Sequence, residues 1–292
     1  PLLNGATVIL NAHEYAPAEY LRNIASENDG PALITTPQQL VAVRNELDGA
    51  EGYFSGATFA LIACCGDMLT PRMVKFAGAS MVPDREHVLN LWIQSESGVA
   101  IISTYAAADL NRAGALGLPA PGTQPLILNN LGQPCRPNES GQLVFSVSWP
   151  GMLRTIWGQD ERFNELYFQR NRGYFSTNDG VRADNEGFYW FMGRLDDVIK
   201  IRGHSLATSE IEAVLLNTPE VTEAAVVGVA DEEDKGLVAF IAAGADILTD
   251  AERCAALEET LAAAITERIG EFAVPSRFIM THELPKTRTG KV

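Results

Sequence analysis

The sequence predicts an α/β protein made of two units, a part of a large αβ domain in residues 1–195 and a smaller α+β domain in residues 196–292. Three observations lead to this prediction. Short apolar runs alternate with capped helices up to about residue 97, and residues 98–195 consist of short β-rich runs between turns. After Arg194, helical and strand patterns alternate again. A chain of 292 residues is long enough for two domains, each with its own core.

The N-terminal third has the pattern of βα units. The apolar runs ATVIL (6–10) and FALIACC (59–65) are continuous, as expected for strands that are buried on both faces. Threonine followed by proline at 36–37, and again at 70–71, places a capping hydroxyl before a proline at the first helical position. Strands that alternate with helices in this way predict a parallel sheet.

Residues 98–195 are expected to form a small antiparallel, barrel-like subdomain. The β-rich runs PLILNN, QLVFSVS and GFYWFMGR are separated by the turn sequences LGQP, PNESG and DNEG. One helix is predicted near residues 160–168. This subdomain completes the larger of the two predicted domains.

Residues 196–292 are predicted to form the smaller α+β domain. DVIKIRG (197–203) has the pattern of a strand pair, and ATSEIEAVLLNT (207–218) that of a helix stopped by Pro219. The runs EAAVVGVA and LVAFIAAG are predicted strands. A long amphipathic helix follows and is expected to end at Gly270.

The composition excludes some classes of function. Hydrophobic residues make up 46% of the chain and charged residues 20%, which is ordinary for a globular protein. The net charge of −15 argues against binding to nucleic acids or anionic membranes, so local donors must hold any anionic ligand. The sequence contains no signal peptide and no apolar run of membrane-spanning length, and we expect a cytoplasmic protein.

The cysteines are expected to be free thiols. None of the four has the spacing of metal ligands: Cys64, Cys65, Cys135 and Cys254. The first two are adjacent within an apolar run, which predicts that they are buried. Reduced cysteines also suit the cytoplasm.

Both ends of the sequence suggest a piece of a longer protein, because it lacks an initiator methionine and stops at LPKTRTGKV (284–292). This last stretch is similar to a P-loop only superficially. Pro285 replaces the first glycine and cannot donate an amide, and Val292 supplies no hydroxyl for Mg²⁺ after Lys291. Two interpretations remain, a solvated basic loop and a mobile catalytic lysine.

Four motifs favour the second interpretation. They are NLWIQSESG (90–98), YFSTNDG (174–180), GRLDDVIKIRGHSLATSEIE (193–212) and LPKTRTGK (284–291). In this order they resemble the adenylate-forming superfamily of acyl-CoA synthetases, luciferases and peptide-synthetase adenylation domains. SWPGMLRTIWGQDERF (148–163) resembles the branch of acetyl-CoA and propionyl-CoA synthetases. The resemblance covers the whole chain but only the later half of the family's length.

The resemblance implies an AMP-forming short-chain acyl-CoA synthetase that uses ATP, CoA and Mg²⁺. A small carboxylic acid attacks the α-phosphate of ATP, pyrophosphate leaves, and the CoA thiolate then displaces AMP. In this family the small domain rotates between the two half-reactions, about a hinge that falls at Asp196. The loop that grips the phosphates lies upstream in the family, so the piece alone is expected to be inactive. The sequence defines neither the oligomeric state nor any fused domain.

The resemblance also implies a nucleotide site. Asp179 would accept both ribose hydroxyls through its two oxygens, and Arg194 would donate to ribose or phosphate. Without the resemblance, Asp179 reads as a turn-forming residue and Arg194 as the partner of a surface ion pair with Asp196 or Asp197. The full set is Gly66, Asp67, Met68, Asn90, Leu91, Trp92, Gln94, Ser95, Asp179 and Arg194.

The remaining roles are carried over in the same way. Glu96 would bind Mg²⁺, and Lys291 would bridge the substrate carboxylate and the α-phosphate as the catalytic residue. Gly203 and His204 would face CoA in the second half-reaction. The alternatives are a polar turn at Glu96, an ordinary turn glycine at 203 and a structural histidine at 204.

Two departures from the branch affect function. Ile93 stands where acetate-specific members place a second tryptophan that closes the acyl pocket, which predicts an acid larger than acetate, such as propionate or 3-hydroxypropionate. Ser205 replaces an arginine that contacts phosphate in the branch. The alternatives to a ligase, or to the ligase module of a multifunctional protein, are an adenylation domain that loads a carrier protein and a non-catalytic nucleotide-binding homologue.

Overall fold

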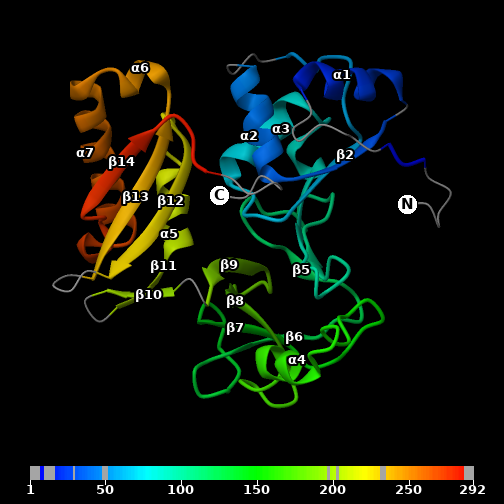
Figure 1. Ribbon diagram of the computed structural model, residues 1–292. Coiled ribbons are helices and arrows are strands. Elements are labelled where there is room, and N and C mark those ends of the chain that lie inside the picture. The colour runs from blue at the N-terminus through cyan, green and yellow to red at the C-terminus, as the bar shows by residue number, and fades with distance from the viewer. Residues whose placement is uncertain are drawn as a thin grey trace.

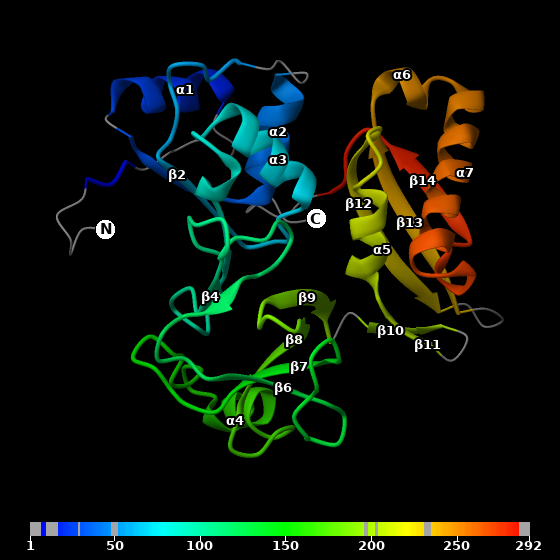
Figure 2. The same cartoon turned by 180° about the vertical axis from the view of Figure 1, so that it is seen from behind.

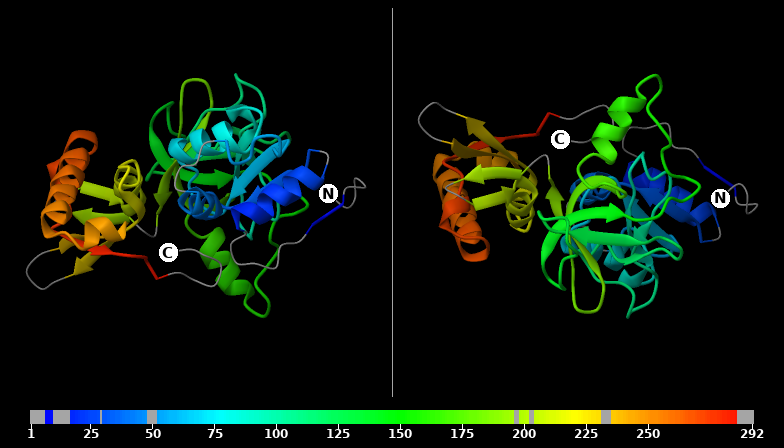
Figure 3. Two further views of the ribbon diagram at one scale, coloured as in Figure 1. Left: turned by 90° about the horizontal axis from the view of Figure 1, so that it is seen from above. Right: turned by 90° about the horizontal axis from the view of Figure 1, so that it is seen from below.

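Two lobes lie side by side in the computed structural model, which describes residues 7–9, 17–28, 30–47, 52–195, 198–201, 204–230 and 235–285. The N-terminal lobe comprises the described residues up to 195, and the C-terminal lobe those from 198 onward. Views from above and below also place the C-terminal lobe to one side of the N-terminal lobe (Figures 1 and 3). Helices and sheets occur in both lobes, which confirms the predicted α/β class.

The first sheet of the N-terminal lobe is mostly parallel. Its order is β1 (Ala32–Thr35), β2 (Leu61–Cys65), β3 (Val88–Trp92), β4 (Ile102–Ser103) and β5 (Leu118–Pro119). Strands β1 to β3 run parallel, as the βα pattern predicts, and β4 and β5 are antiparallel. Among the described residues β1 is an edge strand, and the Ile34 side chain on it is 66% exposed.

Three helices accompany this sheet, α1 (Ala18–Glu27), α2 (Pro37–Glu46) and α3 (Pro71–Ser80), followed by the 3₁₀ turn η2 (Arg85–His87). Helices α2 and α3 begin where the sequence predicts, whereas α1 is not among the predicted helices. The Thr36 hydroxyl accepts a hydrogen bond from the Gln39 amide at 3.3 Å, and Thr70 caps α3 in the same way. Figure 2 shows the three α-helices grouped beside the first sheet. Leu40 and Met73 are among the side chains of their shared core.

One predicted strand is wrong. Residues 7–9 of the ATVIL run lie in no strand, and Val8 and Ile9 are 42% and 49% exposed. An apolar run forms a strand only where a neighbouring strand supplies backbone partners, and residues 7–9 pair with no described strand. The first strand of the sheet is instead β1, which lies outside the runs that periodicity marks.

The second sheet of this lobe is antiparallel and open. Its order is β6 (Pro125–Leu128), β7 (Ser140–Phe145), β8 (Phe175–Ala183) and β9 (Tyr189–Arg194), and α4 (Asp160–Tyr167) packs near β8. The expected barrel is not formed by the described strands, because β6 and β9 are not paired with each other. Four strands are too few to close around a packed interior, and one face instead contributes Phe145 and Phe175 to a core shared with Trp92.

The C-terminal lobe combines a hairpin with a three-stranded sheet. The hairpin consists of β10 (Val198–Ile201) and β11 (His204–Ala207), so the predicted strand pair extends four residues beyond the stretch assigned to it. The sheet has β12 (Val221–Ala230) antiparallel to β13 (Lys235–Ala243), and β14 (Arg277–Thr281) parallel to β13. Its helical segments are α5 (Thr208–Leu215), α6 (Ala245–Leu248), α7 (Ala251–Arg268) and η3 (Glu271–Ala273).

The C-terminal lobe has its own core. Helices α5 and α7 pack together, and Ile211, Leu215, Leu261 and Ile265 are fully buried between the helices and the sheet. Helix α7 ends two residues before Gly270, whose φ of 133° is a backbone conformation that favours glycine, as predicted for the helix end.

The four cysteines are free thiols in the structure, as predicted. Cys64 is fully buried and Cys65 is half-buried. Burial, with a smaller effect of neighbouring Cys65, raises the pKa of the Cys64 thiol to about 12, so this thiol stays protonated at neutral pH. In the part of the chain that the structure describes, none of the helices has the length and hydropathy needed to cross a bilayer.

Candidate functional site

A pocket of about 670 Å³ lies between the two lobes and collects most of the predicted site residues. Its N-terminal wall includes ten of them: Gly66, Asp67, Met68, Asn90, Leu91, Trp92, Ile93, Gln94, Asp179 and Arg194. The first three follow β2, and the next five are the last three residues of β3 and the two that follow it. Because β2 and β3 are parallel neighbours, their carboxyl ends meet at one edge of the sheet, which is where ligands bind in such sheets.

Asp179 contributes a buried carboxylate to this wall, with 3% of its surface exposed. The indole Nε1 of Trp92 donates to Asp179 Oδ2 at 2.8 Å, and Gln94 Nε2 donates to the same oxygen at 3.0 Å. Arg194 lies opposite Asp179 in the β8–β9 pair, and its guanidinium is 3.5 Å from Oδ1. A buried carboxylate is stable only when donors surround it, and these three side chains supply them.

This geometry overturns the turn alternative for Asp179, whereas the ion-pair alternative for Arg194 involves residues outside the described part of the chain. Asp179 does not form a turn, because β8 continues through it, although Asn178 before it has a φ of 60°. Arg194 pairs with Asp179, whereas Asp196 and Asp197 lie outside the described residues. Asn-Asp-Gly is typical of turns, so the sequence motif suggests one. Strand β8, which contains the motif, pairs with β7 on one side and β9 on the other, and this pairing overrides the local preference.

The residues after β3 form a tight turn that contains Ser95 and Glu96. Neither residue lines the pocket: Ser95 is exposed, and Glu96 is half-buried. The buried Ser97 hydroxyl has one proton to donate and lies 2.8 Å from two acceptors, the carbonyl oxygens of Gln94 and Val99. The turn is therefore closed by its own side chain, and Glu96 is held at its outer face.

The segment after β7 clamps this turn from outside. Trp149 Nε1 donates to the Ser97 carbonyl at 2.7 Å, and the Leu153 amide donates to the Glu96 carbonyl at 2.8 Å. The Tyr167 hydroxyl donates to Glu96 Oε1 at 2.9 Å. Burial, followed by this hydrogen bond, raises the pKa of Tyr167 to about 12. The sequence analysis used residues 148–163 only as a mark of the family branch and placed Tyr167 only within a predicted helix, so it missed Trp149 and Tyr167 as supports of the turn.

The donor set at Glu96 suits magnesium better than a metal that needs a protein cage. The described residues contain no group of three or more histidine, cysteine, aspartate or glutamate side chains able to hold a metal. Magnesium needs only one or two carboxylates, because phosphates and waters supply its other ligands. Glu96, half-buried with one oxygen held by Tyr167, fits that pattern.

The C-terminal lobe supplies the opposite wall of the pocket through α5 and the start of β12. Thr208, Ser209 and Glu212 line it from the helix. Glu212 Oε1 accepts a hydrogen bond from the Val226 amide at 2.8 Å, which ties the helix to β12. These three residues lie within one of the four predicted motifs, yet nothing in their spacing indicates that they face the nucleotide motifs.

Other predicted residues cannot be placed against the pocket. Lys291, Gly203 and Asp196 lie outside the described residues. His204 begins β11, and only its backbone is described. The predicted catalytic, CoA-binding and hinge roles therefore stay predictions.

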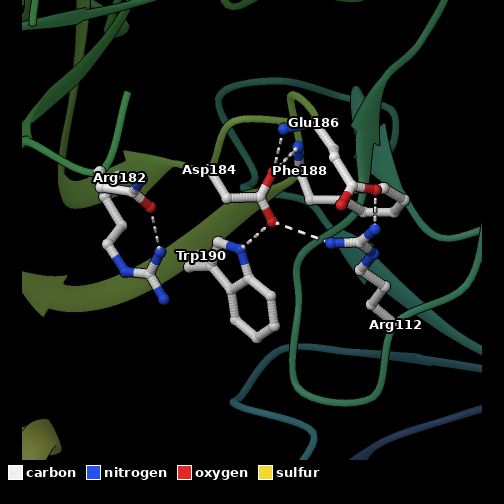
Figure 4. Close-up of polar contacts among 7 residues, drawn as sticks. Arg112, Arg182, Asp184, Glu186, Phe188 and Trp190 are labelled. Atoms are coloured by element: carbon white, nitrogen blue, oxygen red, sulfur yellow. Dashed lines mark hydrogen bonds and ion pairs between the residues drawn. The ribbon is translucent and has the colours of Figure 1, made fainter. Parts of the chain in front are cut away.

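A second polar cluster fixes the β8–β9 hairpin that carries Asp179 and Arg194. Asp184 Oδ1 accepts from the amides of Glu186 and Phe188, both at 3.0 Å, and Oδ2 accepts from Trp190 Nε1 at 3.0 Å (Figure 4). Arg112 completes the cluster with an ion pair to Asp184 at 3.3 Å and another to Glu186, while its guanidinium lies 4.3 Å from the Phe188 ring centroid. The hairpin turn is thereby anchored to the loop between β4 and β5.

Comparison with known proteins supplies matches over both lobes. A family model described as AMP-binding enzyme matches residues 1–157, and one described as AMP-binding enzyme C-terminal domain matches residues 210–291. Acetyl-coenzyme A synthetases of Aeromonas hydrophila subsp. hydrophila and Novosphingobium aromaticivorans are 31% and 33% identical to the chain over 295 residues. Each alignment covers 100% of this chain but 45% of the relative, so the chain spans less than half of their length.

A solved structure shows the same fold. The benzoate CoA ligase from Burkholderia xenovorans LB400 matches with a TM-score of 0.82 and 22% sequence identity, over 99% of this chain and 55% of that chain. The match extends over both described lobes. At this level of identity it concerns the arrangement of the backbone alone.

Proposed function

The chain belongs to the AMP-binding enzyme family, as its four motifs predict, and we propose that it forms part of an AMP-forming acyl-CoA ligase. Such a ligase adenylates a small carboxylic acid with ATP and transfers the acyl group to CoA. The observation that carries the proposal is the buried Asp179 carboxylate, held by Trp92, Gln94 and Arg194 in a pocket between two lobes. The acetyl-coenzyme A synthetases among its relatives support the same reaction class.

In this proposal Asp179 binds the ribose. Trp92 and Gln94 hold Oδ2, so the carboxylate keeps one orientation while it accepts hydrogen bonds from a vicinal diol. Arg194 is the adjacent cation, and it neutralises Asp179 or donates to phosphate as the nucleotide enters. The stretch Gly66–Met68 lines the same pocket and contacts the adenosine.

The charged steps fall to Glu96 and Lys291. Glu96 would hold Mg²⁺, and the bound ion would neutralise part of the negative charge on the phosphates. Tyr167 keeps one Glu96 oxygen in place. Lys291 would bring a positive charge to the α-phosphate and the attacking carboxylate, where negative charge develops. We place the domain boundary at Asp196, with residues 1–195 and 196–292 as the two domains, and Gly203 and His204 on the face that meets CoA.

The acid is proposed to be larger than acetate. Ile93 lines the pocket and is 38% exposed, so its side chain faces open space instead of closing it. A tryptophan at this position would fill the volume of several methylene groups. In an apolar pocket, one methylene changes the discrimination between two substrates by about 1–3 kcal/mol. Propionate or a 3-hydroxypropionate-like acid therefore fits the site better than acetate.

The test is carboxylate-dependent exchange between ATP and pyrophosphate, measured on the complete protein with acids of increasing length. The Asp179→Asn variant is expected to lose most of this exchange, because an amide cannot accept both ribose hydroxyls. Asp109→Asn removes a carboxylate from an exposed loop and is the matched control. Equal exchange rates in the two variants, or exchange that no carboxylate stimulates, would contradict the proposal.

A further inference from the structure

The wall that α5 contributes to the pocket is attached to the N-terminal lobe at both of its ends. Among the described elements, α5 is the helix of the C-terminal lobe that lies nearest to the N-terminal lobe (Figures 1 and 2). One attachment lies just beyond its C-terminal end, on α3, and the other lies near its N-terminal end, on β9. The two attachments use different physical means.

Arg72 makes the first attachment. Its guanidinium extends from α3 and donates to the Pro219 carbonyl at 3.0 Å and the Thr218 carbonyl at 3.2 Å, with the Leu216 carbonyl 3.5 Å away. Leu216 caps the C-terminal end of α5, and Thr218 and Pro219 follow it in the connection to β12, where the Thr218 carbonyl also accepts from the Val221 amide at 3.1 Å. A planar cation with several donors can bind more than one of these carbonyls at once.

Arg72 is half-buried where it makes this contact. Burial lowers the pKa of Arg72, and the nearby Arg44 lowers it further, whereas Glu220 acts in the opposite direction. A guanidinium remains charged despite such a shift. The contact is therefore a set of charge-assisted hydrogen bonds between the two lobes, and such bonds are stronger than those between neutral groups.

Gly193 makes the second attachment by having no side chain. A Cβ at this position would lie 2.4 Å from Ser209 Oγ and 2.6 Å from Ala207 Cβ, and the backbone φ is 106°. The start of α5 can therefore approach β9 closely. Gly193 pairs with Gly180 in the same strand pair that joins Arg194 to Asp179, so this approach brings α5 next to the buried carboxylate.

We propose that Arg72 and Gly193 form a two-point seat that holds α5 as a wall of the pocket, and that Arg72 is the positioning residue that keeps the C-terminal lobe in this orientation. Two contacts at opposite ends of a helix fix its direction, whereas one contact would leave the lobe free to turn about it. The inference goes beyond the ligase proposal, because it concerns how the lobes are held and stands whether or not the chain forms an adenylate.

The test measures the distance between the lobes directly. Glu27 on α1 and Glu259 on α7 are both exposed, and each is replaced by an amino acid with a ketone side chain. A spin label that reacts with ketones is then attached at these two positions, so the native cysteine thiols are not labelled. Pulsed dipolar spectroscopy of the 292-residue chain, without nucleotide, then gives the distribution of interlobe distances. Arg72→Ala is expected to broaden this distribution at least about twofold, because the lobe gains other orientations.

The controls separate loss of the seat from loss of the fold. Lys75→Ala removes an exposed cation from the same helix, α3, and is expected to leave the distribution unchanged. Gly193→Ala is expected to shift the main distance, because the added methyl pushes α5 away from β9. Circular dichroism of each variant checks that both lobes remain folded.

Two outcomes would overturn the inference. The first is that folded Arg72→Ala gives the same distribution of interlobe distances as Lys75→Ala. The second is that, if Arg72→Ala does not fold, the main interlobe distance in Gly193→Ala is the same as in the parent chain. Broadening in Arg72→Ala alone among the α3 variants supports the seat even where the protein shows no pyrophosphate exchange, so failure of the ligase proposal is a separate result.

Discussion

The indole Nε1 of Trp92 and the Oδ2 atom of Asp179 are 2.8 Å apart, and this hydrogen bond joins the two sheets of the N-terminal lobe. Trp92 ends β3 of the first sheet, and Asp179 lies within β8 of the second. The same indole packs against Phe145 at a centroid distance of 5.9 Å, so one side chain serves both the core and the site. The position of the buried carboxylate therefore depends on how the two sheets pack.

We predict that Trp92→Phe weakens nucleotide binding. The phenyl ring keeps the packing on Phe145 but removes one donor from Asp179, and a hydrogen bond to a charged group is worth about 1.5–3 kcal/mol. Affinity for AMP is expected to fall at least about tenfold by calorimetry on the complete protein. Trp157→Phe is the control, because that indole is 96% exposed. Equal affinities in the two variants would argue against a binding role for Asp179.

A second prediction concerns the acyl pocket. Ile93→Trp fills the open space beside Ile93 and is expected to shift the preference between propionate and acetate toward acetate by at least about tenfold. Initial rates of adenylation for the two acids, measured on the complete protein, give the ratio. The same change at exposed Val99, which does not line the pocket, is the control. An unchanged ratio in Ile93→Trp would place the acid elsewhere.

We predict that Gly98→Ala destabilises the turn that carries Glu96. A Cβ at Gly98 would lie 2.2 Å from the Gly151 carbonyl oxygen, and the φ of 67° is already unfavourable for alanine. Gly122→Ala is a matched control, because Gly122 has a φ of 85° but open space around the added atom. Urea unfolding should show a loss for Gly98→Ala that exceeds that of the control by at least about 1 kcal/mol. Equal losses would mean that the loop at Gly151 gives way without cost.

Alkaline unfolding should report the contact between Tyr167 and Glu96. Folding raises the pKa of Tyr167 from 10.0 to about 12, chiefly by burial and then by the hydrogen bond to Glu96. A raised phenol pKa stabilises the folded state below pH 10, and this contribution is lost as the pH rises from 10 toward 12. Tyr167→Phe should therefore lose less stability over that interval than the parent chain or Tyr105→Phe. Parallel stability curves for all three proteins would exclude this linkage.

Local pattern predicts much of the fold. Thr-Pro starts predict α2 and α3 because a capping hydroxyl and a fixed φ act within one turn of helix. Alternation of apolar runs and helices predicts the buried strand β2 and the parallel pairing of its sheet. The same reasoning fails for residues 7–9, because an apolar run gives no information on whether a partner strand is present. It also fails for the expected barrel, because closure depends on strand count and pairing.

The candidate site, like the fold, is only partly predictable from local sequence. Motif resemblance predicts the set of residues at the N-terminal wall, including Asp179 and Arg194. It does not predict that Trp92 and Gln94 share one oxygen of Asp179, because that contact depends on the packing of two sheets. Arg72 carries no signal at all in the sequence. Its role arises only from the position of α5, and surface cations are too common for one to stand out.

The unpaired side of β1 has a practical consequence for anyone who purifies this chain. Within the described residues β1 pairs only with β2, and Ile34 on it is 66% exposed. A strand edge with an exposed aliphatic side chain is a template for pairing with another molecule. Concentrated samples are therefore expected to self-associate and precipitate through this edge. Replacing Ile34 with lysine is a simple gatekeeper substitution that should keep them monodisperse.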